Sequence, residues 1–182
     1  MSSIEQNPLI LQSLDELSSA LSEVERTTFD SIIRTMKIPR SVYENRCSWS
    51  QESYTRNCII ENEKFELILL CWEKGQFTPI HDHGGEECWV KVIEGEFKET
   101  IYQKDDSGEL KMIKSAISKS NEITYMIDFM GYHRLENLSN GRSMTLHLYA
   151  KPIHSCNILN EDSGKFVKKD MTYDTESEKK TI

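Results

Sequence analysis

Three histidines are the residues in this chain that could bind a metal. His81 and His83 are two positions apart, and side chains two apart on a β-strand point to the same face of a sheet. Two imidazoles can therefore aim at one point. A third imidazole from a distant strand, for which His133 is the candidate, would complete a site with open coordination positions. Such a site supports redox or Lewis-acid chemistry, whereas structural metal sites are closed.

Polar side chains that could serve a bound substrate occur at two further places. Arg56 carries a guanidinium, which can bind a carboxylate through two parallel hydrogen bonds and stays charged when partly buried. For a single arginine, a salt bridge at a strand edge is the plainer interpretation. Thr145, His147 and Tyr149 alternate with leucines, which places three polar side chains on one face of a strand.

Size and charge exclude several classes of protein. The chain has 182 residues, enough for one domain with an ordinary core, and a formal net charge of −8. Without a basic patch, we expect no nucleic acid partner. The longest apolar stretch, residues 65–72, is too short to span a bilayer, and the N-terminal residues MSSIEQNP lack the pattern of a signal peptide. The sequence therefore predicts a protein with no membrane partner.

The cysteines indicate a reducing compartment. Their number is odd, they are scattered, and no two of them form a C-x-x-C pair, which argues against a disulfide framework or a structural zinc site. We expect a cytoplasmic location, where ferrous iron and free thiols both persist. The five are Cys47, Cys58, Cys71, Cys88 and Cys156.

Residues 1–45 are predicted to form two helices that cover one sheet. Ser13 and Glu16 have the spacing of a capping box, and leucines follow at helical intervals. A second amphipathic pattern starts near Phe29 and ends before Pro39.

Residues 46–173 are predicted to form the β part of a single domain spanning residues 1–182, with residues 174–182 as a flexible tail. Many short strands separated by frequent turns indicate a sandwich or barrel, including jelly rolls and cupins. The predicted strands are 57–60, 65–72, 88–93, 97–102, 112–117, 123–126, 133–137, 144–149 and 166–173.

The spacing of the first histidine pair resembles a cupin motif. The block reads Gly75-x5-His81-x-His83-x4-Cys88-x6-Gly95, with cysteine where most cupins have glutamate. The second cupin motif ends in H-x3-N, which His133 and Asn137 match, with Gly131 ahead of them. The resemblance implies a mainly β, jelly-roll-like cupin barrel with N-terminal helices.

Further segments narrow the resemblance to the cysteine dioxygenases, the thiol dioxygenase branch of the cupins. The similarity runs from about Trp49 to Tyr173 and depends on many short pieces in order. These are Tyr54-Thr55-Arg56-Asn57, Leu70-Cys71-Trp72, His81-Asp82-His83, Cys88, Glu94-Gly95, Lys98-Glu99-Thr100, Gly131-x-His133-Arg134-x-Glu136-Asn137, Leu146-His147-Leu148-Tyr149 and Cys156.

The resemblance implies an iron-dependent enzyme that oxidises L-cysteine with O2 to cysteine sulfinic acid. His81, His83 and His133 would bind Fe(2+). Arg56 would bind the substrate carboxylate, with Tyr54 adding a hydroxyl. Related mercaptopropionate dioxygenases usually carry glutamine at the arginine position, so arginine points to cysteine itself. The expected partners are L-cysteine and O2, and the expected state is a monomer.

The same resemblance assigns catalytic roles around Tyr149. Thr145 would hold His147, and His147 would orient the Tyr149 hydroxyl towards the iron. Cys88 and Tyr149 would be able to join through a thioether, as in many eukaryotic members. Cys156 would lie near the mouth of the pocket.

Several alternatives stay open at this stage. Glu87 has the H-x3-E spacing that some cupins use for a carboxylate ligand, which would suit manganese or copper; for Glu87 and its neighbour Glu86 the plainer interpretation is a solvated loop. The substrate could be another small thiol such as 3-mercaptopropionate. The chain could instead be a non-catalytic cupin that binds metal and a small ligand, although such a protein has no need of Arg56, Tyr54 and Tyr149 together.

Overall fold

The computed structural model describes residues 11–176. The chain divides into two compact units, one ending at Glu44 and one beginning at Asn45. That the two form a single domain, with the helices covering a sheet, stays a prediction. Neither α1 nor any other helix in the described part of the chain has the length and apolar run needed to cross a bilayer.

The first unit is helical, as predicted. Ser13 caps α1, because its hydroxyl accepts a hydrogen bond from the Glu16 amide at 3.2 Å, and the Glu16 carboxylate accepts one from the Gln12 amide at 2.7 Å. The leucines at helical spacing are buried along α1. The helices are α1 (Leu14–Glu23), η1 (Arg26–Thr28), α2 (Phe29–Thr35) and η2 (Arg40–Arg46), the last of which reaches into the second unit.

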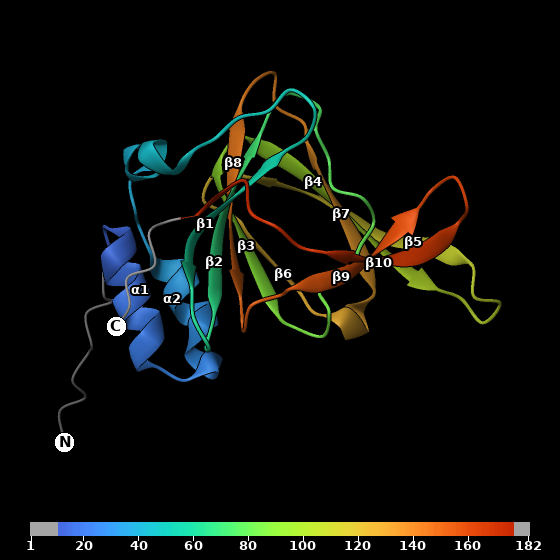
Figure 1. Cartoon of the computed structure of the whole chain (residues 1–182), viewed down its shortest axis with the longest axis horizontal. Helices are drawn as coiled ribbons and strands as arrows, with labels where there is room; N and C mark the ends of the chain where they lie inside the picture. The colour runs from blue at the N-terminus through green and yellow to red at the C-terminus, as the bar shows by residue number, and fades with distance from the viewer. Residues whose placement is uncertain (1–10, 177–182) are drawn as a thin grey trace. The chain divides into compact units, whose positions relative to one another are not determined.

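The second unit consists of short strands, one more 3-10 turn and tight connections (Figure 1). Every predicted strand is present within a few residues of its expected bounds. The elements are β1 (Thr55–Glu61), β2 (Glu66–Trp72), β3 (Cys88–Glu94), β4 (Glu96–Lys104), β5 (Leu110–Lys119), β6 (Ile123–Met126), η3 (Asp128–Met130), β7 (Tyr132–Asn137), β8 (Ser143–Tyr149), β9 (Ser155–Asn160), β10 (Lys165–Asp170) and β11 (Thr175–Glu176).

One layer of this unit is a six-stranded sheet in the order β11-β1-β2-β8-β3-β6. All seven residues of β2 are buried, and the strand pairs with β1 on one side and β8 on the other. β2 and β8 run antiparallel, with Glu66 opposite Tyr149 and Ile68 opposite His147. β8 also pairs with β3, which places Cys88 opposite Tyr149.

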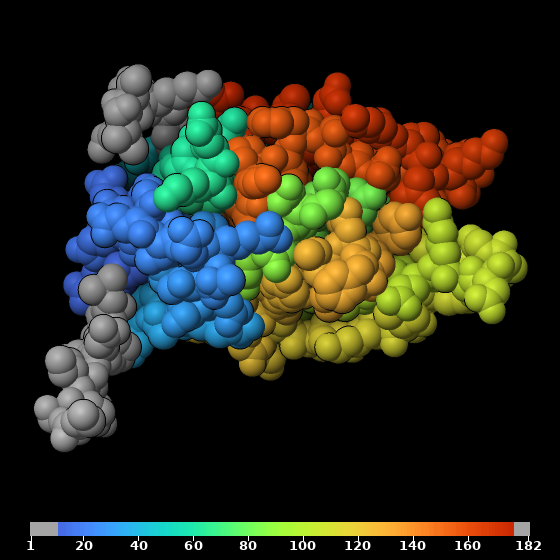
Figure 2. Space-filling view, turned by 90° about the horizontal axis from the view of Figure 1, so that it is seen from below, coloured from blue at the N-terminus to red at the C-terminus, as the bar shows by residue number. Residues whose placement is uncertain are grey.

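The second layer joins the sheet β5-β4-β7 to the hairpin β9-β10. The connecting piece is the extended segment of residues 77–83, which bridges Glu136 through Phe77, and both His133 and Ile158 through His81. Figure 2 shows that the hairpins β4–β5 (yellow-green) and β9–β10 (orange-red) extend towards the same end of this unit.

The two layers pack face to face and enclose the core. Trp72 on β2 and Phe97 on β4 meet edge to face at 5.3 Å between ring centroids. The architecture is therefore the predicted jelly-roll-like one, mainly β with N-terminal helices. In the described residues, strand pairing does not close the two layers into a full barrel. The core residues are Ile68, Leu70, Trp72, Cys88, Val90, Val92, Phe97, Leu135, Tyr149 and Ile153.

Two strands were not predicted, and one expectation is wrong. β9 lacks clear alternation, and β11 is only two residues long, so neither carries a local strand signal. Residues 174–176 were expected to belong to a flexible tail. Thr175 and Glu176 instead pair in parallel with β1, where Asn57 lies opposite Thr175. The rest of that tail, residues 177–182, lies outside the described residues.

Candidate metal centre

Backbone pairing brings His81 and His133 together from segments 52 residues apart. The two residues exchange a pair of backbone hydrogen bonds, at 3.0 Å from the His81 amide and 2.9 Å from the His133 amide. Their Nε2 atoms lie 3.2 Å apart. Gly131 allows β7 to start here, because its φ is +113° and a Cβ would lie 2.1 Å from the carbonyl oxygen of Tyr102.

Hydrogen bonds at the far side of each ring fix which nitrogen faces the centre. His81 Nδ1 lies 2.9 Å from the Pro79 carbonyl oxygen, so it carries the proton and donates it. His133 Nδ1 lies 2.7 Å from Glu99 Oε1, and Glu99 is itself buried. Both Nε2 atoms therefore present lone pairs to each other. Two facing lone pairs repel unless a cation lies between them.

His83 completes the group. Its amide donates to Asp128 Oδ1 at 2.8 Å, and the other carboxylate oxygen of Asp128 accepts from the Gly85 amide at 2.5 Å, which holds the loop. The His83 ring is buried, and neither of its nitrogens has a hydrogen-bond partner. Its centroid lies 4.6 Å from that of His133 and 5.5 Å from that of His81. A buried imidazole with no partner is costly unless a ligand completes it.

Burial keeps the rings of His81 and His83 neutral, the form in which imidazole binds a metal. Burial lowers the pKa of His81 to about 3 and holds the pKa of His83 well below its usual range. The ligand atoms of the three histidines lie within 4.8 Å of one another. Two nitrogens about 2.1 Å from one ion lie roughly 3.0–3.4 Å apart, which the 3.2 Å spacing of the Nε2 atoms matches. Three imidazoles suit a transition metal. The residues present fit a metal cofactor.

Glu87, the alternative fourth ligand, lies outside this group. Its carboxylate accepts a hydrogen bond from the Tyr125 hydroxyl at 2.6 Å. Across residues 11–176, the three histidines are the only cluster of His, Cys, Asp or Glu side chains with metal-binding geometry. The geometry thus favours three ligands over four.

Cys88 and Tyr149 are cross-strand neighbours, and a thioether between them stays a prediction. They are directly opposite on β3 and β8, so their side chains share a face of the sheet, and both are buried. Burial raises the pKa of the Cys88 thiol and of the Tyr149 phenol well above their usual values. The Tyr149 ring lies 5.7 Å from the His83 ring.

A chain of hydrogen bonds leads to His147 from the same sheet. Trp72 Nε1 donates to Thr145 Oγ1 at 3.0 Å. The same hydroxyl lies 2.9 Å from His147 Nε2, within hydrogen-bond distance. His147 Nδ1 faces Cys88 Sγ at 4.0 Å. The predicted link from Thr145 to His147 has hydrogen-bond geometry, and a link from His147 to the Tyr149 hydroxyl stays a prediction.

Arg56 lies on β1 with its side chain buried and partly unpaired. Its Nε donates to the Thr172 carbonyl oxygen at 3.1 Å, whereas Nη2 is buried and has no hydrogen-bond partner. The positive charge of Arg56 contributes to the lowering of the pKa of His81, which places the guanidinium within electrostatic reach of that histidine. The guanidinium can therefore accept an anion beside the metal site.

Tyr54 and Cys156 lie near Arg56. The Tyr54 ring stacks on Trp72 with 4.7 Å between centroids. Burial raises the pKa of Tyr54, and the positive charge of Arg56 opposes that change. Cys156 is buried, and its sulfur lies 3.4 Å from that of Met171.

Four residues at the site were not predicted from the sequence. Glu99 and Trp72 occur in the segments that carry the family resemblance, but nothing local marked them as partners of His133 and Thr145. Glu66 carried one signal, since it interrupts the longest apolar stretch. Tyr173 carried none, because its contacts are to residues more than 100 positions away.

Comparisons with known proteins agree with this geometry. The sequence matches the family described as Cysteine dioxygenase type I over residues 6–162. Cysteine dioxygenase type 1 of Danio rerio is 30% identical over 173 residues, which cover 89% of this chain and 86% of that protein. The Homo sapiens protein of the same name is 35% identical over 129 residues, covering 69% of this chain and 64% of that protein.

Solved structures show the fold. Lactobacillus farciminis oxalate decarboxylase, in its formate complex, superposes with a TM-score of 0.51 at 14% sequence identity. The superposition covers 64% of this chain and 34% of that one. At this level of identity the likeness concerns the fold alone.

Proposed function

The chain belongs to the cysteine dioxygenase type I family, and on that basis we propose that it is an iron-dependent dioxygenase that oxidises L-cysteine with O2 to cysteine sulfinic acid. Both oxygen atoms go to the substrate sulfur. The single observation that carries the choice of substrate is the buried, unpaired Nη2 of Arg56, whose charge reaches His81. A carboxylate on a small thiol fits that group.

His81, His83 and His133 would hold the iron. Ferrous iron supplies O2 activation and a site for the thiolate of the substrate. Three neutral histidines leave the ion its full charge, and this favours an anionic thiolate. Iron rather than manganese or copper is the choice that the family favours, and the donor set is compatible with it.

The remaining residues position the substrate. Arg56 binds the carboxylate with two parallel hydrogen bonds, and Tyr54 adds a hydroxyl. Tyr149 places its phenol near the substrate sulfur, with His147 and Thr145 behind it. These assignments depend on the side chains that share the interior face of β1, β2, β3 and β8.

Cys88 and Tyr149 would form a thioether during turnover. The new bond joins Sγ to a ring carbon next to the phenolic carbon. The thiol proton and the ring hydrogen leave, and O2 takes up the two electrons and two protons. The cross-strand pairing of the two residues supports this proposal.

We also propose a monomer in the cytoplasm. All five cysteines are free, which suits a reducing compartment.

The test is oxygen uptake by the iron-loaded protein. We would titrate the protein with Fe(2+) without air, add L-cysteine, admit air, and measure O2 consumption and sulfinate by mass spectrometry. Each of His81→Ala, His83→Ala and His133→Ala is expected to fold but to lose iron and activity. Folded, iron-loaded protein that binds cysteine but consumes no O2 would favour a non-catalytic binding cupin. Faster use of 3-mercaptopropionate than of cysteine would refute the choice of substrate.

A further inference from the structure

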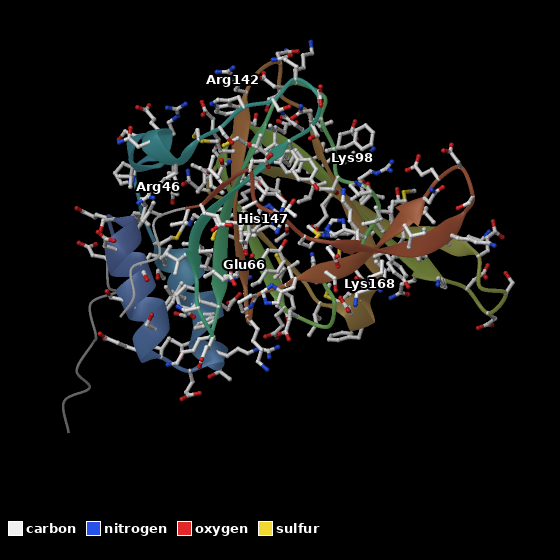
Figure 3. The ribbon with its side chains drawn as sticks, viewed as in Figure 1. Arg46, Glu66, Lys98, Arg142, His147 and Lys168 are labelled. Carbon is white, nitrogen blue, oxygen red and sulfur yellow. The ribbon has the colours of Figure 1, made fainter. Side chains whose placement is uncertain are left out.

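A second buried charge lies beside the proposed substrate arginine. Glu66, at the start of β2, is fully buried and lies opposite Tyr149 in the sheet. Figure 3 labels it close to His147 of the neighbouring strand β8. Burial raises the pKa of the Glu66 carboxyl, and hydrogen bonds and Arg56 oppose that change. The proposed reaction gives this carboxylate no role.

Arg56 and Glu66 interact electrostatically, but among the described residues they do not form an ion pair. The Glu66 charge is among the influences that raise the pKa of Arg56 against the opposing effect of burial. No ion pair of Arg56 occurs among the described residues, and its Nη2 keeps no hydrogen-bond partner. Opposite charges in a buried region attract strongly, so a guanidinium left open next to a carboxylate requires something that holds the two apart.

Tyr173 holds the carboxylate. Its hydroxyl donates to Glu66 Oε1 and also lies 3.0 Å from Glu61 Oε2, while the Ile153 amide donates to Glu66 Oε2 at 3.3 Å. Burial and the hydrogen bond to Glu66 raise the pKa of the Tyr173 phenol, which keeps its proton in place. The Tyr173 ring also lies 5.9 Å below the Arg56 guanidinium.

We propose that Tyr173 is a positioning residue that keeps Glu66 away from Arg56, so that the guanidinium stays open for the substrate carboxylate. Without the phenol, the Glu66 carboxylate loses its hydrogen bond from Tyr173 and pairs with Arg56, whose charge already acts on it. It then competes with the carboxylate of cysteine. The inference deepens the proposed function and rests on it, because it takes Arg56 as the group that binds the substrate.

The test is a rescue experiment with four iron-loaded variants. We would compare Tyr173→Phe, Glu66→Gln and the double variant with Glu61→Gln, which neutralises the exposed carboxylate beside the same phenol. In Tyr173→Phe the KM for cysteine is expected to rise about tenfold, which corresponds to about 1.4 kcal/mol, with little change in kcat. In the double variant the KM returns to near the wild-type value, because a neutral amide cannot compete for Arg56. Glu61→Gln leaves KM unchanged.

Binding without turnover gives an independent measurement. Calorimetric titration with L-cysteine in the absence of O2 is expected to follow the same pattern across the variants, whereas cysteamine, which lacks the carboxylate, binds all of them alike. An unchanged affinity in Tyr173→Phe refutes the inference. So does a double variant that stays as weak as Tyr173→Phe, because the loss would then be structural.

The failures of the two proposals are distinguishable. If the wild-type protein neither binds nor oxidises cysteine, the proposed function fails and this inference fails with it. If the wild-type protein does both and the variants match it, only this inference fails. Should Tyr173→Phe not fold, Glu66→Gln decides alone. Because Glu66→Gln removes the competing carboxylate, its KM for cysteine is expected to be at or below the wild-type value. A raised KM overturns the inference.

Discussion

Replacement of Arg56 by glutamine gives the most direct test of how this protein would recognise its substrate. Arg56 is buried on β1, and its Nε donates to the Thr172 carbonyl oxygen at 3.1 Å. Nη2 has no partner and is free to bind. Glutamine is shorter and neutral, and it can offer a carboxylate at most one hydrogen bond in place of two.

The expected loss follows from the hydrogen bonds that disappear. A hydrogen bond to a charged group contributes about 1.5–3 kcal/mol. The glutamine variant loses one of the two hydrogen bonds to the substrate carboxylate, and a neutral amide makes the remaining one. At about 1.4 kcal/mol for each factor of ten, cysteine affinity should fall roughly 10- to 150-fold. Iron affinity should stay nearly constant, because Arg56 is not one of the three histidine ligands.

The assay measures KM for cysteine by O2 uptake and iron affinity by titration on the same samples. Arg142→Gln is the matched control, since this exposed arginine pairs with Glu73 at 2.9 Å and changes the net charge equally. Activity on 3-mercaptopropionate, relative to cysteine, is expected to rise in Arg56→Gln. Unchanged cysteine kinetics would refute the reasoning and leave the substrate carboxylate without an assigned partner.

Three further outcomes test the rest of the site. Glu99→Gln should weaken metal binding about 10- to 100-fold in a Co(2+) or Fe(2+) titration, because Glu99 orients His133 from the far side of the ring; wild-type affinity would show that this contact is dispensable. Glu87→Gln should keep its metal, and a loss would favour a fourth ligand. After turnover, a fraction of the protein should carry a Cys88–Tyr149 thioether, seen as a joined tryptic peptide that survives reductant and a mass lower by about 2 daltons. Cys88→Gly should abolish that species and keep much of the activity, whereas a linked peptide still present in it would refute the assignment.

The local pattern of the sequence determined most of the strands and the face that each side chain takes. Alternation along a strand has a period of two, so the shared face of Thr145, His147 and Tyr149 follows from the sequence alone. The capping box at Ser13 and the turns between strands are equally local. The metal ligands and Arg56 were named from their types, their spacing and the family resemblance.

Contacts between distant segments were decided only by the tertiary structure. Periodicity tells which face a residue takes but not which strand lies beside it, so the pairing of Cys88 with Tyr149 and of His81 with His133 required the strand register.

The same limit explains why Tyr173 was missed. It reaches Glu66 across 107 positions of sequence and lies next to a two-residue strand with no local signal. Packing brings a buried carboxylate and a buried guanidinium to neighbouring strands of one sheet, with Tyr173 in contact with both.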